Sequence, residues 1–109
     1  MIIVEKNEGR KIDYEVQDTS TKKKITFDDD LTINLAKREE DWAVHIDICY
    51  DRDGELVIGA AAGRAYVAEI DIPARTYEQG EPSGDEDETP LVPVPLDLNK
   101  VTLSLWAID

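Results

Sequence analysis

Alternation of apolar and polar side chains with a period of two is the feature that most limits how this chain can fold. Five segments show it clearly, at residues 12–16, 31–35, 42–50, 66–72 and 101–105. Because successive side chains of a β-strand point to opposite faces, each segment predicts a strand with one apolar and one polar face. Strands of this kind are typical of an antiparallel sheet with one solvated side.

Length and composition fit a single domain. The chain has 109 residues, of which 41% are apolar, and a chain of this size buries one modest core. We therefore expect one all-β domain over residues 1–109. The expected architecture is a mostly antiparallel β-sandwich or partly open barrel of about seven or eight short strands.

Turn-forming residues separate several of these strands. The turns at residues 7–10 and 51–54 contain glycine together with Asn or Asp, which tolerate positive φ or bond their own backbone. Residues 99–100 predict a tight hairpin, although they lack glycine. Residues 35–42 contain helix formers and could make a helical turn, but strong alternation on both sides favours a hairpin loop.

An acidic segment at residues 78–89 is followed by a proline-rich segment at 90–96. The acidic segment has six acids, no base and no aliphatic side chain. It cannot bury enough apolar surface to offset the entropy of ordering, so we expect a mobile, disordered loop. The second segment includes Pro93 and Pro95, and each proline removes a backbone donor. It predicts an edge strand or an extended segment across the core.

The charge balance restricts the partners of this chain. It has 25 acids against 12 bases and a formal net charge of -13. Direct binding to nucleic acid or to an anionic membrane surface is disfavoured, because both need Lys and Arg. The charge favours solubility, attraction of cations or binding to a basic protein.

The sequence contains one cysteine, Cys49, so a disulfide within the chain is excluded. The apolar run at residues 1–4 is too short for a signal peptide, and no segment reaches the ~20 apolar residues of a membrane span. We therefore expect a cytoplasmic protein. The residues next to Cys49 are acidic, and a nucleophilic thiol needs positive charge nearby. Cys49 is therefore interpreted as a small space-filling residue and not as a nucleophile.

Polar side chains of two predicted strands form the strongest candidate site. His45 and Asp47 share one face of the first strand, and Glu69 and Asp71 share one face of a later strand. If the strands are neighbours, these four residues line one surface, and imidazole with carboxylates suits a transition-metal ion or Mn²⁺. Close carboxylates could also raise each other's pKa and serve acid–base chemistry. The alternative interpretation is a solvated, charged sheet face without a function.

The two tryptophans differ in their place in the pattern. Trp42 is in phase with the apolar positions of its strand and is expected in the core. Trp106 is on the polar side of the last strand, so it either covers a second layer of the sandwich or anchors a partner interface. We favour the interpretation that Trp106 covers a second layer of the sandwich. The candidate interaction residues are Trp106, Pro93 and Pro95.

No segment carries a recognisable catalytic motif, and we expect neither an enzyme nor a bound cofactor. The favoured hypothesis is a non-enzymatic protein-interaction or structural accessory domain, whose partner is a basic protein or a second copy of this chain. One alternative is an acidic nucleic-acid mimic that blocks a basic DNA- or RNA-binding protein. The other is a cation-binding module or metal-dependent enzyme built on the four polar residues above.

Overall fold

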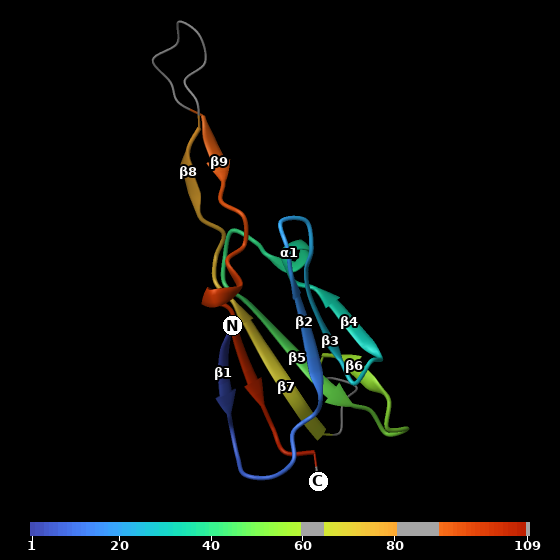
Figure 1. Ribbon diagram of the computed structural model, residues 1–109. Helices are drawn as coiled ribbons and strands as arrows, with labels where there is room; N and C mark the ends of the chain where they lie inside the picture. Colours follow the sequence, from blue (N-terminus) through green and yellow to red (C-terminus); the bar gives the residue numbers. More distant parts are fainter. Residues whose placement is uncertain (60–64, 81–89, 109) are drawn as a thin grey trace, which may run out of the picture.

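The computed structural model describes residues 1–59, 65–80 and 90–108, which form three β-sheets (Figure 1). The expected all-β, mostly antiparallel fold is confirmed. The described residues contain ten strands, more than the seven or eight expected, because several segments without clear alternation also pair. The sheets have five, three and two strands, and the described strands do not close into a barrel. Within the described part of the chain, no helix has the length and apolarity needed to span a membrane.

The five-stranded sheet carries most of the structure. Its strand order is β1–β10–β7–β5–β6, with bounds Ile2–Glu5, Thr102–Leu105, Ala65–Ile72, Val44–Tyr50 and Leu56–Ile58. β1 is parallel to β10, and the other pairs are antiparallel. β1 forms one edge of the sheet, where Ile2, Ile3 and Val4 are all exposed.

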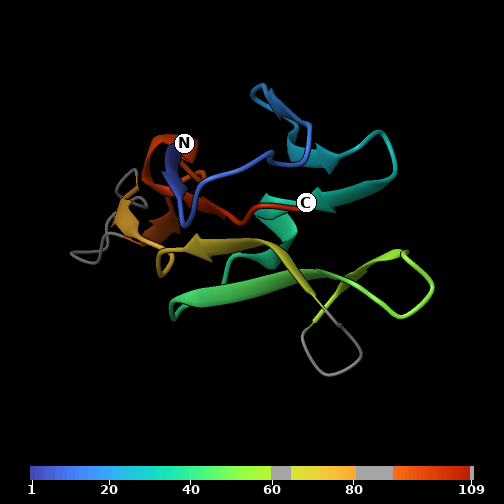
Figure 2. The same cartoon turned by 90° about the horizontal axis from the view of Figure 1, so that it is seen from below.

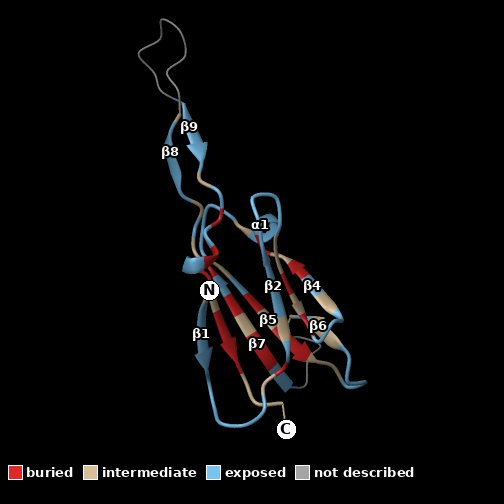
Figure 3. Cartoon of the chain, viewed as in Figure 1, coloured by how far each residue is buried: buried red, intermediate tan, exposed pale blue. Residues whose placement is uncertain are grey.

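The three-stranded sheet covers one face of the larger sheet, which we call the inner face. Its order is β2–β3–β4, with bounds Tyr14–Asp18, Lys23–Phe27 and Leu31–Asn34. Figure 2 shows its blue-to-cyan strands as a layer apart from the green β5 and the yellow β7. The core between the layers combines Ile25 and Phe27 of β3 with Ile48, Ile70 and Leu103 of the larger sheet. Buried segments therefore concentrate where the layers meet (Figure 3).

The turn at residues 51–54 joins β5 to β6 as an antiparallel hairpin, as expected. The Asp51 Oδ1 atom accepts hydrogen bonds from the backbone N–H groups of Asp53 and Glu55, at 2.8 and 3.0 Å. Gly54 has φ +79°, a conformation that favours glycine. Local turn chemistry is therefore sufficient to form this hairpin.

A β-bulge interrupts the pairing of β5 with β7. Ile48 is opposite Ala68, whereas the next residue, Cys49, is opposite Tyr66, so Val67 has no direct partner. The extra residue changes the phase of the alternation, as bulges do. Val67 and Ala68 are therefore both buried, and Tyr66 is 42% exposed. The alternation alone had placed Tyr66 with Ala68 on the apolar side, which is wrong.

The prediction of a hairpin loop at residues 35–42 is wrong. This segment begins with one helical turn, α1 (Leu35–Arg38), because the Asn34 Oδ1 atom accepts a hydrogen bond from the Lys37 N–H and caps the turn. The chain then passes from the smaller sheet to the larger one, so β4 and β5 are not paired. Trp42, expected in the core, lies in this connection and is 63% exposed.

Other connections also cross between sheets, and two of them include segments singled out in the sequence. Residues 99–100 belong to a 3-10 helix, η1 (Leu98–Lys100), and not to a tight hairpin, because the Asp97 side chain accepts a bond from the Asn99 N–H. Residues 7–10 lead from β1 to β2 in the other sheet. Gly9, with φ +125°, is required there, since a Cβ atom at this position would lie 2.8 Å from the Ala107 Cβ.

The proline-rich segment forms an edge strand, one of the two structures expected for it. Among the described strands, β9 (Leu91–Pro93) pairs with β8 (Tyr77–Gln79) alone, and the two make a ribbon that extends from the body of the domain (Figure 1). Residues 78–79 of the segment expected to be a mobile loop are therefore part of a strand. Residues 81–89 of that segment lie outside the described residues.

We predict contrasting effects for a buried and an exposed aromatic side chain, Phe27 and Trp42. Phe27→Ala leaves a cavity in the core and is expected to lower the free energy of unfolding by about 3–5 kcal/mol. Trp42→Ala removes an exposed side chain and is expected to lower it by less than about 1 kcal/mol. Urea unfolding of both variants measures the difference, and equal losses would contradict the placement of Trp42.

Candidate functional site

The outer face of the larger sheet, which points away from the smaller sheet, carries four ionisable side chains at neighbouring positions. The register of β5 on β7 puts His45 opposite Asp71 and Asp47 opposite Glu69. The intervening residues Ile46 and Ile70 are buried in the core, so the four polar side chains point outwards. We call these four residues the His45 cluster. The two strands are neighbours, so the four residues proposed from the sequence do come together.

Both ring nitrogens of His45 face carboxylates. The distance from His45 Nδ1 to Asp71 Oδ1 is 2.6 Å, and the distance from His45 Nε2 to Asp47 Oδ1 is 2.8 Å. Glu69 Oε1 lies 3.4 Å from the same Nε2 atom. The imidazole is thus held between Asp71 on one side and two carboxylates on the other.

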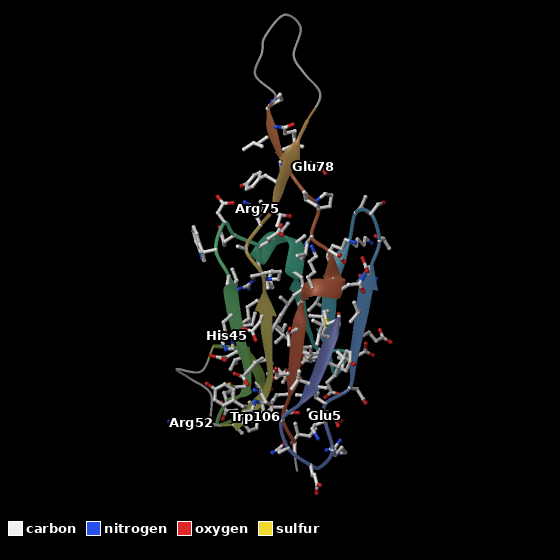
Figure 4. The ribbon with its side chains drawn as sticks, turned by 90° about the vertical axis from the view of Figure 1, so that its left-hand side faces the viewer. Glu5, His45, Arg52, Arg75, Glu78 and Trp106 are labelled. Atoms are coloured by element: carbon white, nitrogen blue, oxygen red, sulfur yellow. The ribbon has the colours of Figure 1, made fainter. Side chains whose placement is uncertain are left out.

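The position of the Glu69 side chain is fixed by a hydrogen bond from Trp106, which comes from a third part of the larger sheet. The indole N–H of Trp106, which directly follows β10, donates a hydrogen bond of 2.7 Å to Glu69 Oε2. The Trp106 ring also contacts Tyr66, with ring centroids 6.2 Å apart. Trp106 therefore lies on the outer face beside the His45 cluster and does not cover a second layer of the sandwich (Figure 4).

The carboxylates change the proton affinity of their neighbours. The pKa of His45 is raised above 6.5, chiefly by its hydrogen bond to Asp71 and also by Asp47, while desolvation opposes the increase. The pKa of the Cys49 thiol is raised by burial and by the charges of Asp47 and Glu69. Cys49 is 2% exposed, in agreement with a space-filling residue. This thiol stays protonated at neutral pH and is a poor nucleophile.

The cluster supports two kinds of chemistry. His45 can hold a proton between the carboxylates, or its Nε2 atom can act as a metal ligand together with oxygens of Asp47 and Glu69. Asp71 already uses one oxygen on Nδ1 and serves to orient the ring. The side chains of Asp47 and Glu69 are 23% and 19% exposed, so both carboxylates are partly accessible to solvent.

Sequence reasoning did not identify Tyr66 and Trp106 as parts of this site. Trp106 was singled out because it was out of phase with the core, and that signal was informative. Its pairing with Glu69 joins residues that are 37 positions apart, which no local pattern indicates. Tyr66 was missed because its place depends on the bulge.

The other candidate interaction residues lie far from Trp106, at the base of the ribbon. Pro93 and Pro95 line a groove of about 450 Å³, together with Tyr77, Leu96 and residues of α1 and the β2–β3 connection. Figure 4 shows Arg75 and Glu78 at this end, well apart from His45 and Trp106. The three predicted interaction residues therefore belong to two separate surfaces.

Hydrogen bonds to the segment that follows α1 fix the base of the ribbon. The Arg75 side chain donates to the Glu39 carbonyl oxygen at 2.8 Å and to the Asp41 carboxylate at 3.2 Å. The Tyr77 hydroxyl donates to the same Asp41 carboxylate at 2.5 Å. The Arg75 backbone N–H also donates to the Glu40 carbonyl oxygen. The first residue of β8 is thereby tied to the segment that follows α1.

The chain matches no family model, and neither a curated protein nor a solved structure shows significant similarity to it. Function is therefore argued from the geometry of the two surfaces.

We predict that the imidazole of His45 titrates above pH 6.5 in the metal-free protein. His45 is the only histidine, so a single imidazole signal in NMR reports its pKa directly. Asp71→Asn removes the largest cause of the increase and is expected to lower this pKa towards 6.5. Asp53→Asn, a charge change in the β5–β6 turn, is the control and should leave it unchanged.

The same pKa predicts how stability depends on pH. The folded-state pKa of His45 is raised, so its contribution to stability is fully present below about pH 6.5, the unfolded value, and is lost as pH rises through the folded pKa. Wild-type protein should therefore lose more stability above pH 6.5 than His45→Gln does. Urea midpoints at several pH values in the presence of EDTA measure this, and parallel profiles would contradict it.

Proposed function

We propose that this chain is a non-enzymatic protein-interaction domain that docks a protein partner through the ribbon. The observation that carries the proposal is the exposure of apolar side chains on the ribbon, where Leu91, Tyr77 and Val92 are 68%, 45% and 36% exposed. A two-stranded ribbon is marginally stable by itself and usually buries one face against other structure. Leu91 and Tyr77 lie on one face of the ribbon and Val92 lies on the other, and exposed apolar surface on a folded domain is typical of interaction sites.

The hydrogen bonds that Arg75 and Tyr77 make at the base of the ribbon favour this function. Asp41 receives bonds from both Arg75 and Tyr77, so the start of β8 has a fixed orientation relative to the body. A surface that is already ordered loses less conformational entropy on binding. The ribbon is therefore presented in one orientation to the partner.

The groove at the base of the ribbon extends the same surface. Its apolar lining includes Pro93, Pro95 and Leu96, while Lys23 and Arg75 contribute polar edges. Both cations are already engaged, Lys23 by Asp18 and Arg75 by Glu39 and Asp41. Among the described residues that line it, the groove thus has no cation free for an acidic group and is suited to an apolar side chain of the partner.

The net charge of -13 supports a basic partner. Long-range attraction would speed its association, and apolar contacts with the ribbon and the groove would supply most of the affinity. A second copy of the chain carries the same charge and would be repelled. This favours a different protein over self-association, which sedimentation or light scattering measures directly.

We predict that Leu91→Asp weakens partner binding tenfold or more, because an apolar anchor in the centre of an interface is replaced by a charge. The experiment is affinity capture from a lysate of the source organism, with wild-type and variant protein as baits, followed by titration of the recovered partner. Unfolding temperatures of the two baits should agree, since Leu91 is exposed.

Ile58→Asp is the matched control, because Ile58 is an exposed apolar strand residue of β6 and is 40% exposed. It should retain partner binding. Equal capture by wild type and Leu91→Asp would overturn the proposal. A partner that is a nucleic-acid-binding protein and is released by moderate salt would favour the acidic mimic instead.

A further inference from the structure

We infer that the His45 cluster is a binding site for a divalent transition-metal ion, held by His45 Nε2 and by one carboxylate oxygen each from Asp47 and Glu69. Zn²⁺ is the ion that suits these ligands best. The site lies on the outer face of the larger sheet, away from the ribbon. The inference is therefore independent of the proposed protein interaction.

The three ligand atoms are already close to metal-binding distances. They all lie within 4.8 Å of one another, and His45 Nε2 is 2.8 Å from Asp47 Oδ1 and 3.4 Å from Glu69 Oε1. Zn²⁺ binds nitrogen and oxygen at about 2.0–2.2 Å, so two ligands of a tetrahedral site are about 3.3 Å apart. Small side-chain rotations are enough to place an ion between them.

Residues outside the ligand set orient two of the three ligands. In the neutral tautomer that donates Nδ1–H to Asp71, the Nε2 lone pair of His45 is directed towards Asp47 and Glu69. Trp106 donates to Glu69 Oε2, which leaves Oε1 facing His45. A carboxylate behind a ligating histidine and a donor behind a ligating carboxylate are the usual outer partners of protein metal sites.

The placement of like charges also favours a bound cation. Asp47 and Glu69 are directly opposite each other on β5 and β7. Like charges at opposed positions of an antiparallel pair destabilise the sheet. A divalent ion at their meeting point converts this repulsion into attraction for both carboxylates.

The ligand types select among metals. One imidazole nitrogen with two carboxylate oxygens suits Zn²⁺ and its transition-metal neighbours, whereas Ca²⁺ and Mg²⁺ prefer six or more oxygens. His45 is 47% exposed in its side chain, so a water molecule can complete the coordination from the open side. Cys49 is buried, with 2% of its surface exposed, so it is not counted among the ligands.

The test is thermal unfolding of the full chain with Zn²⁺, in comparison with Mg²⁺ and Ca²⁺ at the same ionic strength. Zn²⁺ at a hundred times its dissociation constant should raise the midpoint by about 10–20 °C, which is the expected linkage effect for a domain of this size. Mg²⁺ and Ca²⁺ should give only the small shift of a simple salt. Equal shifts with all three ions would overturn the inference.

Variants separate the ligands from general charge effects. Asp47→Asn and Glu69→Gln each remove a ligand charge with little change in shape, and both should abolish the Zn²⁺-induced shift. Asp53→Asn removes the same charge in the β5–β6 turn and should retain it. Cys49→Ser should also retain it, and loss of the shift in that variant would assign the metal to the thiol. Co²⁺ provides a readout independent of stability, because its visible absorption bands should appear in wild type and be lost in Glu69→Gln.

The role of Trp106 in positioning Glu69 is tested with a pair of tryptophan variants. Trp106→Phe replaces the indole by a phenyl ring and so keeps an aromatic side chain without the N–H donor, which should weaken Zn²⁺ binding by about 10–100-fold. Trp42→Phe changes an exposed tryptophan that is not part of the cluster and should leave the affinity unchanged. Calorimetric titration gives both values, and equal affinities would remove Trp106 from the site.

Discussion

The pairing of β5 with β7 is the interaction on which both faces of the larger sheet depend. The register that buries Ile46 opposite Ile70 also holds His45 opposite Asp71. Since side chains alternate strictly, a slip of one residue would turn the ionisable groups into the core and the isoleucines towards water. Burying unpaired charges costs far more than any gain from a new register. The packing of the core on the inner face therefore also sets the geometry of the His45 cluster on the outer face.

The faces of the strands could be predicted from the sequence, whereas their partners could not. The period of two correctly placed Asp47 and Glu69 on polar faces. It carries no information on which strands are neighbours, and the cluster exists only because β5 and β7 pair. The bulge at Val67 shows the second limit, because one unpaired residue reverses the phase and moves Tyr66 to the outer face.

Connections were the least predictable parts of the fold. Segment 35–42 was interpreted as a hairpin loop because alternating strands flank it, and residues 99–100 were interpreted as a tight hairpin. In the structure the strands on either side belong to different sheets, so the chain must cross between layers. The bonds that hold one crossing come from Arg75, more than thirty residues away in sequence, to Glu39 and Asp41. Turn chemistry was sufficient only where the strands do pair, as at residues 51–54.

Because the edge strand β1 is exposed, the high negative charge of the chain has a consequence for how molecules associate in solution. β1 presents Ile2, Ile3 and Val4 at an edge that pairs with no other described strand, and neither proline nor lysine interrupts this exposed stretch. Such an edge can template sheet growth between molecules. A net charge of -13 keeps two copies apart at low ionic strength. The acidity of the chain thus acts as a barrier to edge-to-edge assembly, and this barrier falls with added salt or at acidic pH, where the carboxylates are neutralised.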